Sequence, residues 1–419
     1  MCTMATPSGR KSVAQMNRRR ALQLLAALGT TGLAAGCGSG EDDTGEQAGS
    51  GSPIKIGLIV PGSGANKAIG DEITNGFQLY LRLRGQQIAG HPVTLVPAEE
   101  GSTAASGKAA VERLIKEGVL ALTGVVSPTV MTGIKDSVEQ ARVPLIGSNA
   151  SPSTLQGVVY IWRTSYVLTE PGEALGEYLR QKLDASSRIA IFGTRGQGSQ
   201  DVVEGLRRAY ERGRRLTEDP IYTDDSDNPS RNLYAGPIRK ALERKPDAVF
   251  CHYSGAQAVQ FVKQLYALGY RGPIYAPGFL TEGTALDQLD DGEKGRDRKL
   301  IEANGIETAL NYSADLNNTA NRIFASAYRK TFNSAPTTYA MASYDAALVL
   351  DKAIRLAGAN PSPQQVNLAL GKVGQVDSPR GPWQFNQTRT PQQKWYLRRV
   401  QTDGRLLSNI VINELATLG

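Results

Sequence analysis

From Ile54 onward, short apolar runs alternate with amphipathic runs, and this alternation constrains the fold more than any other feature. The first run, Ile54–Val60, has the length of a strand. In the next segment Ile73, Phe77 and Leu81 recur at helical spacing. Strands that alternate with helices predict a parallel sheet covered by helices on both faces, with right-handed crossovers.

The alternation occurs in two sets. The first set predicts strands at Ile54–Val60, Val93–Ala98, Leu120–Thr123 and Val143–Ile146, and helices at Asp71–Arg84, Ala104–Glu117 and Thr129–Gln140. After an extended stretch at Tyr160–Thr164, the second set predicts strands at Arg188–Phe192, Ile221–Tyr222, Ala248–Cys251 and Ile274–Ala276, and helices at Glu170–Lys182, Ser199–Arg212, Leu233–Glu243 and Ala256–Leu268. Each set completes one α/β sheet, so the pattern predicts two lobes of similar architecture.

The tail departs from this pattern. Asn318–Phe332 and Ala340–Leu356 predict two consecutive helices, and Trp383–Phe385 with Trp395–Val400 predicts a hairpin. The polar run Asp287–Lys299 is expected to be a surface loop. Helices followed by strands indicate that the chain revisits both lobes, which would make the hinge multi-stranded.

The N-terminus has the parts of a secretory signal. A basic stretch with Arg18, Arg19 and Arg20 precedes an apolar run from Ala21 to Ala35, which is short for a membrane span. The ending Leu-Ala-Ala-Gly-Cys resembles the bacterial lipobox, whose cysteine, here Cys37, is acylated and becomes the new N-terminus. The arginines also resemble a twin-arginine signal, and a short buried helix is the alternative interpretation.

Residues 38–53 are rich in glycine, serine and acidic side chains, which is the composition of a flexible tether. A lipid and a tether together predict an exported protein that works at the extracytoplasmic face of the cell membrane without crossing it.

Composition excludes several classes of site. The formal net charge is +7, but the first 36 residues hold five cations and no acid. An arginine cluster near Arg207–Arg215 fits a solvated helix end better than a nucleic-acid patch, so no nucleic-acid partner is expected. Three cysteines and two histidines leave no zinc spacing and no disulfide in the body, and Cys251 is expected to pack as a small apolar side chain. We expect no metal and no cofactor.

The loops that follow strands carry the candidate binding residues, because ligands in open α/β sheets lie beyond the carboxyl ends of strands. Four such loops are rich in small polar residues: Pro61–Gly64, Gly124–Thr129, Gly147–Pro152 and Gly193–Gly198. Helix capping is an alternative role for these residues. The first loop lacks the P-loop pattern, and the fourth matches a dinucleotide fingerprint only superficially.

No catalytic constellation is recognisable. The chain has no G-x-S-x-G elbow and no HExxH pattern, and neither His91 nor His252 lies in a triad-like context. His252 ends a strand beside Tyr253 and could be a wall of a site or a strand end. We therefore expect a protein that binds without catalysis.

The order of these segments resembles the branched-chain amino acid (Leu/Ile/Val-type) periplasmic binding proteins of ABC importers. The resemblance begins with Ile54–Pro61 and continues through Ala110–Leu155, Arg163–Thr164 and Gly381–Phe385. It covers essentially Ile54 to Val411 and implies an α/β fold of type I, with two Rossmann-like lobes and parallel-type sheets joined by a three-stranded hinge. It also implies a ligand held between the lobes.

The resemblance suggests the binding residues and the division of the chain. The expected ligand-binding residues are Ile69, Ser127, Pro128, Thr129, Asn149, Ser151, Tyr166, Gln197, Ser254, Gly278 and Phe279. The expected segments are a signal peptide (1–36), a lipid-anchored linker (37–53), lobe 1 (54–164), lobe 2 (165–281), a return to lobe 1 (282–375) and a return to lobe 2 (376–419).

Several positions depart from the family pattern. Branched-chain amino acid binders usually carry an aromatic residue where Ile69 stands and tyrosines where Gln197 and Ser254 stand. The acid that grips the α-ammonium would fall at Gly278, and Pro128 removes an N–H from the loop expected to hold the carboxylate. Two further expectations concern residues nearby: Glu282 is close enough to replace the missing acid, and Tyr166 could form an aromatic wall.

The sequence thus predicts a monomeric, lipid-anchored solute-binding protein that closes around a small polar ligand, an amino acid or an amide-like molecule, and delivers it to ABC permease subunits. Two alternatives remain at this stage. One is a ligand-sensing module that signals to a different membrane partner, and the other is a secreted hydrolase.

Overall fold

The structure is a computed structural model that describes residues 51–64, 66–149, 152–155, 157–224, 233–289, 303–403 and 406–419. The expected signal peptide (1–36), the lipidation site Cys37 and the binding candidate Ser151 lie outside these residues. Most of the expected linker (37–53) lies outside them as well.

The first sheet has six strands within the described residues, in the order β2-β3-β1-β4-β5-β6. The strands are β1 (Ile54–Val60), β2 (Gln87–Ile88), β3 (His91–Glu99), β4 (Ala121–Gly124), β5 (Leu145–Gly147) and β6 (Ile161–Arg163). Strands β3, β1, β4, β5 and β6 run parallel to one another, and β2 runs antiparallel to its neighbour β3. β1 is central, with Ile56 opposite both Leu95 and Ala121, so its apolar run is buried on both faces.

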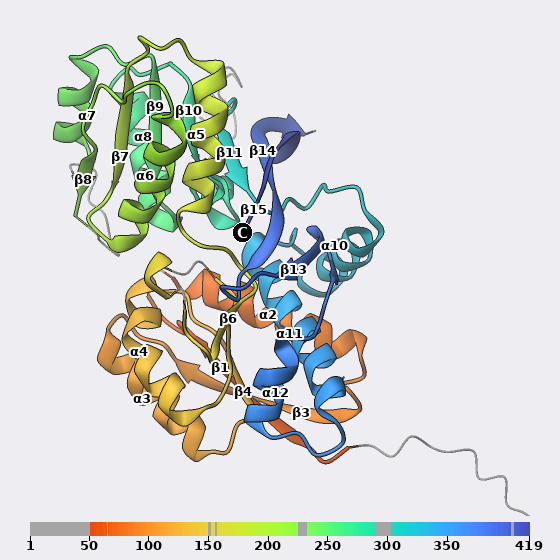
Figure 1. Ribbon diagram of the computed structural model, residues 1–419. Coiled ribbons are helices and arrows are strands. Elements are labelled where there is room, and N and C mark those ends of the chain that lie inside the picture. The colour runs from red at the N-terminus through yellow and green to blue at the C-terminus, as the bar shows by residue number, and fades with distance from the viewer. Residues whose placement is uncertain are drawn as a thin grey trace, which may run out of the picture. The chain divides into compact units, whose positions relative to one another are not determined.

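Helices cover both faces of this sheet. They are α2 (Lys67–Leu83), α3 (Ala104–Lys116), α4 (Pro128–Ala141), α11 (Thr338–Ala357) and α12 (Pro363–Leu370). Helix α10 (Thr319–Phe332) packs against α2 and α11. Ile56 packs with α2, α11 and α12 on one face, and Ile59 packs with α3 and α4 on the other. Figure 1 shows α11 and α12, in blue, beside the orange first sheet although they come late in the chain.

The second sheet has nine strands in the part of the chain that the structure describes. They are β7 (Ile189–Thr194), β8 (Ile221–Thr223), β9 (Ala248–His252), β10 (Ile274–Pro277), β11 (Glu307–Leu310), β12 (Val376–Ser378), β13 (Gly381–Phe385), β14 (Pro391–Asp403) and β15 (Leu406–Leu418). The order β8-β7-β9-β10-β11 is parallel, and the sheet continues through the antiparallel strands β14, β13 and β12, with β15 paired to β14.

Helices also cover both faces of the second sheet. They are α5 (Glu170–Lys182), α6 (Gln197–Tyr210), α7 (Ala235–Leu242), α8 (Gly255–Ala267) and α9 (Thr284–Leu289). Ile191 faces α5 and α6, whereas Phe192 faces α7 and α8. Cys251 lies in this second core and is fully buried, as predicted, and burial raises the pKa of its thiol far above the ordinary value.

The parallel strands have the same order in both lobes. Numbered within each lobe, the order is 2-1-3-4-5, as β3-β1-β4-β5-β6 and as β8-β7-β9-β10-β11. Three connections join the lobes: 164–169 after β6, 311–318 after β11, and 371–390 between α12 and β14, which includes the short strands β12 and β13. The predicted fold class is therefore confirmed.

Some sequence predictions need correction. Residue 282 is too early for the return to lobe 1, because β11 still pairs with β10 in the second sheet. The predicted loop Asp287–Lys299 begins inside α9. Strands β11 and β15 and helix α12 were missed, whereas the hairpin of β13 and β14 was predicted correctly. In the described ranges no helix has the length and apolarity that a membrane span requires.

The contact between α2 and α11 depends on Gly76. A Cβ at Gly76 would lie 2.0 Å from the backbone oxygen of Ala340. We expect Gly76→Ala to lower the free energy of unfolding by about 1–3 kcal/mol, as overpacking does. Gly236 in α7 is the matched control, since a Cβ there meets nothing within 4 Å. Gly236→Ala should be neutral or stabilising by about 0.5–1 kcal/mol. Urea unfolding of both variants checks this prediction, and equal effects would contradict it.

Candidate functional site

A cavity of about 230 Å³ lies where the carboxyl ends of the two parallel sheets meet. In a sheet of order 2-1-3-4-5 the connections after the first and third strands run to opposite faces, which opens a crevice between them. Here those strands are β1 and β4 in one lobe and β7 and β9 in the other. The segments that follow β4, β7 and β9 all line the cavity, and Asn66 lines it after β1.

Three helices begin at the cavity. Pro128 starts α4, Gln197 starts α6 and Gly255 starts α8, and all three residues line the cavity. The first N–H groups of a helix have no acceptor within the helix, and the helix dipole places partial positive charge there. Ser254, the N-cap residue of α8, makes no side-chain capping bond among the described residues. The cavity therefore offers N–H donors at the starts of α6 and α8 and hydroxyl donors from both lobes. The start of α4 offers fewer, because Pro128 has no N–H and the N–H groups of Ser127 and Val130 are already bonded.

No aspartate, glutamate, lysine or arginine is among the described residues that line the cavity. Its polar side chains are hydroxyls, amides and the imidazole of His252, whose Nδ1 lies 2.8 Å from Ser199 Oγ. A positively charged ligand group would find no carboxylate there. A negatively charged group would find helix N-termini, which are natural anion sites.

Aromatic rings form one wall of the cavity. Phe279 and Tyr339 stack with centroids 6.0 Å apart and an interplanar angle of 17°. His252 meets Phe279 edge-on at 6.1 Å. Tyr339 stands at the start of α11, a helix of the first lobe, so the two lobes contribute to a single aromatic wall.

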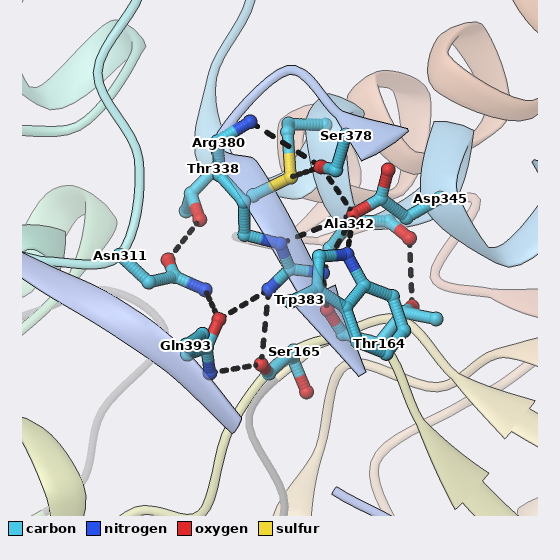
Figure 2. Close-up of polar contacts among 11 residues, drawn as sticks. Thr164, Ser165, Asn311, Thr338, Ala342, Asp345, Ser378, Arg380, Trp383 and Gln393 are labelled. Atoms are coloured by element: carbon cyan, nitrogen blue, oxygen red, sulfur yellow. Dashed lines mark hydrogen bonds and ion pairs between the residues drawn. The ribbon is translucent and has the colours of Figure 1, made fainter. Parts of the chain in front are cut away.

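The three connections between the lobes meet in one buried polar network, shown in Figure 2. Arg380 is its centre, since its guanidinium donates to Asp345 at 2.7 Å and also to the backbone oxygens of Thr164 and Ser165. Arg380 donates to Gln393 too, and Gln393 in turn donates to the Ser165 oxygen at 2.8 Å. Asn311 extends the network by donating to Gln393 at 2.8 Å.

Burial dominates the energetics of this network. The side chains of Arg380 and Asp345 are 1% and 0% exposed. Burial raises the pKa of Asp345, whereas Arg380, Ser378 and Trp383 act to lower it. A buried ion pair contributes little net stability, but removing one partner leaves an uncompensated charge. The network therefore keeps the three connections together by penalising any arrangement that separates its charges.

A profile of the family described as periplasmic binding protein matches residues 53–405. The chain belongs to the periplasmic binding protein family. The Leu/Ile/Val-binding protein homolog 6 of Brucella melitensis is 24% identical over 361 residues, which cover 83% of this chain and 87% of the homolog. This match confirms the predicted resemblance to the Leu/Ile/Val type.

Solved structures show the same fold. A solute-binding protein of an ABC transporter from R. palustris, in complex with benzoate, aligns with a TM-score of 0.76 at 24% identity over 87% of this chain and 97% of that chain. A leucine-binding protein from Thermotoga maritima aligns with a TM-score of 0.74 at 20% identity over 86% of this chain and 99% of that chain.

The structure brings most of the predicted binding residues of this periplasmic binding protein to the cavity. Eight of them line it: Ile69, Ser127, Pro128, Thr129, Asn149, Gln197, Ser254 and Phe279. Tyr166 does not, because it is buried behind Phe279 and stacks on that ring at 5.7 Å. Gly278 does not line it either.

The structure accounts for the glycine at position 278. A Cβ there would lie 2.6 Å from Nη2 of Arg398, and this arginine forms a buried ion pair of 2.8 Å with Glu282. Glu282 also accepts the N–H of Thr338 at 2.9 Å. The expectation that Glu282 replaces the missing acid is therefore wrong, since its carboxylate is already committed to Arg398 and Thr338 away from the cavity.

Sequence reasoning missed several residues of the cavity wall, for example three that come from different parts of the chain. Asn66, Leu168 and Tyr339 line the cavity but lie in none of the four polar loops. Leu168 belongs to the first connection between the lobes, and Tyr339 belongs to a helix that returns to lobe 1. Tyr339 follows the N-cap Thr337, so a helix-start signal existed, but nothing in the sequence assigned that start to the cavity.

Arg380 offers a direct test of the network. Arg380→Met should lower the free energy of unfolding by about 3–5 kcal/mol, because Asp345 is then buried without its partner. The matched control is Lys67→Met, which removes the exposed 2.6 Å pair between Lys67 and Asp71 and should change stability by less than about 1 kcal/mol. Chemical unfolding measures both variants, and a small effect of Arg380→Met would contradict the central position of the arginine.

Proposed function

We propose that this chain is an extracytoplasmic solute-binding protein of an ABC importer that captures a small monocarboxylate with an apolar or aromatic body. The observation that carries the proposal is the composition of the cavity, in which helix starts, hydroxyls and aromatic rings surround the ligand space and the described lining has no charged side chain. The protein would release the ligand chemically unchanged.

The described residues that line the cavity include no carboxylate, which disfavours an α-amino acid. An ammonium group that loses water needs a paired charge, because desolvating an isolated ion is very costly. In this chain the position expected to hold the acid is Gly278, and the nearby Glu282 is paired with Arg398. A ligand with a carboxylate and no ammonium avoids this cost.

Proteins of similar fold support both parts of this proposal. Solved solute-binding proteins have been described with benzoate, 3,4-dihydroxybenzoic acid and 4-hydroxybenzoate, and others with isoleucine or leucine. The fold thus accommodates both ligand classes. Phe279 and Tyr339 favour the aromatic acids, because both rings line the cavity and give a ligand ring an aromatic wall to pack against.

Capture would proceed by closure of the two lobes. Each lobe supplies part of the cavity wall, with Ser127 on one side and Ser254 on the other. A ligand favours the closed form by its greater affinity for it, and the hinge network limits the motion to the three connections. Micromolar affinity corresponds to about −8 kcal/mol, which a few hydrogen bonds and the desolvation of one ring can supply.

Delivery to a permease fits the location that we propose. The family is periplasmic, and the lipobox-like ending at Cys37 would attach the mature protein, as a monomer, to the outer face of the cell membrane. The closed form would then be recognised by ABC permease subunits.

The ligand class can be tested by calorimetry and thermal shift with benzoate, 4-hydroxybenzoate and L-leucine. We expect the aromatic acids to stabilise the chain, by about 2.7 kcal/mol at a hundred times the dissociation constant, and leucine to have no effect. Stabilisation by leucine alone would contradict the proposed class.

Ser254 allows a sharper version of this test. Ser254→Asp retains a good N-cap residue for α8 but places a negative charge in the cavity, and Ser254→Asn is the neutral control of equal size. Benzoate binding should weaken at least a hundredfold in the Asp variant, because like charges at about 4 Å repel by about 4 kcal/mol. The Asn variant should lose far less. Equal losses in the two variants, measured by calorimetry, would argue against a carboxylate ligand.

The anchor can be tested in cells that express the full chain. Cys37→Ser should move the protein from the membrane fraction to the soluble extracytoplasmic fraction, since one acylated cysteine supplies the membrane affinity. Cys2→Ser is the matched control and should leave the protein in the membrane fraction. Membrane association of the Cys37→Ser variant would refute the lipid anchor.

A further inference from the structure

Glu100 lies directly behind the cavity wall without lining it. It follows β3 and is 1% exposed. Its Oε2 accepts the N–H of Val126 at 2.8 Å, and its Oε1 accepts the N–H of Ser127 at 2.7 Å. Val126 and Ser127 line the cavity immediately before α4. A buried carboxylate thus holds two consecutive backbone N–H groups of the binding loop.

The loop that Glu100 holds has an unfavourable backbone. Gly124 has φ of 103°, and a Cβ there would lie 2.2 Å from the Ile59 oxygen. Val125 has φ of 65°, which is rare for a β-branched residue. Residues in such conformations persist only where the surroundings enforce them, and they gather at functional sites.

The surroundings enforce this conformation from several sides. Val125 N–H donates to the Ile59 oxygen at 2.8 Å, and the Val126 oxygen accepts from Asn149 Nδ2 at 2.9 Å. Glu100 is the only one of these partners that binds two groups of the loop. With both N–H groups taken by Glu100, the loop presents Ser127 and Thr129 to the ligand space.

The Ser127 hydroxyl is well placed for this role. Its oxygen accepts the N–H of Val130 at 3.3 Å, which caps α4, so the hydroxyl proton is left to donate. A shift of the Val126–Ser127 backbone would move this donor and the start of α4 together.

We propose that Glu100 is a positioning residue that, through its ionised carboxylate, sets the geometry with which Ser127 and Thr129 meet the ligand. The proposal rests on the proposed function, because it assigns Glu100 a part in binding a carboxylate in this cavity. A neutral carboxyl or amide has only one good acceptor oxygen facing two donors, so the loop would lose one of its two hydrogen bonds.

The chemistry of Glu100 makes this role dependent on pH. Burial raises the pKa of Glu100 from 4.5 to about 7, the N–H groups of Val126 and Ser127 lower it, and the neighbouring charge of Glu99 raises it. Glu99 binds the N–H of Gly62 at 2.9 Å and is the charged group beside Glu100 in the described residues. Benzoate affinity should therefore fall as the pH is lowered through about 7.

Stability should respond in the opposite direction. The pKa of Glu100 is higher in the folded state than in the unfolded state, so the folded state binds the proton more tightly. Its contribution to stability is complete below pH about 4.5 and is lost as the pH rises through about 7. If Glu100 had only a structural role, lowering the pH would favour its contribution to stability and would not weaken the binding of benzoate.

The test compares Glu100→Gln with the wild-type chain, using benzoate as the probe in calorimetry at about pH 6, 7 and 8. At the highest pH the variant should bind about tenfold or more weakly, as expected for one lost hydrogen bond to a charged group, without a loss of thermal stability. Its affinity should also lack the wild-type dependence on pH. Glu99→Gln is the control and should bind like the wild type at the highest pH, where Glu100 is ionised in both proteins. His252 faces the cavity in the wild type and in both variants, so its effect on benzoate affinity is common to all three proteins.

A second measurement needs no ligand. The amide proton shifts of Val126 and Ser127, followed by NMR, should titrate together in the wild type and stay constant in Glu100→Gln. Wild-type affinity and an unchanged pH profile in the variant, or amide shifts that ignore pH, would overturn the proposal. If no tested carboxylate binds the wild type, the proposed function fails, and the amide titration still decides whether Glu100 holds the loop.

Discussion

The buried pair of Arg380 and Asp345 is the interaction on which the two-lobed arrangement depends. It lies where the three connections meet, and the same guanidinium donates to backbone oxygens of the first connection and to Gln393 of β14. Separating these groups would strand a charge in the interior, which costs several kcal/mol. The pair therefore holds the three connections together.

The repeated strand order determines where the cavity forms. Because both lobes follow the order 2-1-3-4-5, each has a crevice at the carboxyl ends of its strands, and helices that follow β4, β7 and β9 begin at the same cavity. The cavity wall then presents helix dipoles and hydroxyls, and the nearest buried acids are used for the architecture. Glu282 neutralises Arg398, and Glu100 holds the Val126–Ser127 backbone.

Local sequence patterns predicted most of the elements. The first strand and α5 were both predicted with their observed bounds. A continuous apolar run and a helical spacing can both be recognised from residues that are close together in the sequence. Strand β11 was missed because its run Glu307–Leu310 is short and begins with an acid that is satisfied only by Arg399, Lys182 and Tyr178. That pairing is tertiary, and no local pattern encodes it.

The sequence by itself determined the alternation of strands and helices and the loops at strand ends, since both follow from residue type and spacing along the chain. The departure at Gly278 was found through the resemblance to the Leu/Ile/Val-type binding proteins. Only the tertiary structure decided that Tyr339 joins the cavity wall, that Tyr166 stands behind Phe279, and that Glu282 is occupied by Arg398. These outcomes depend on which distant groups meet in the interior. The interior has low polarity, so each buried charge needs a partner. The polar groups that are not used in such pairs determine the chemistry of the site.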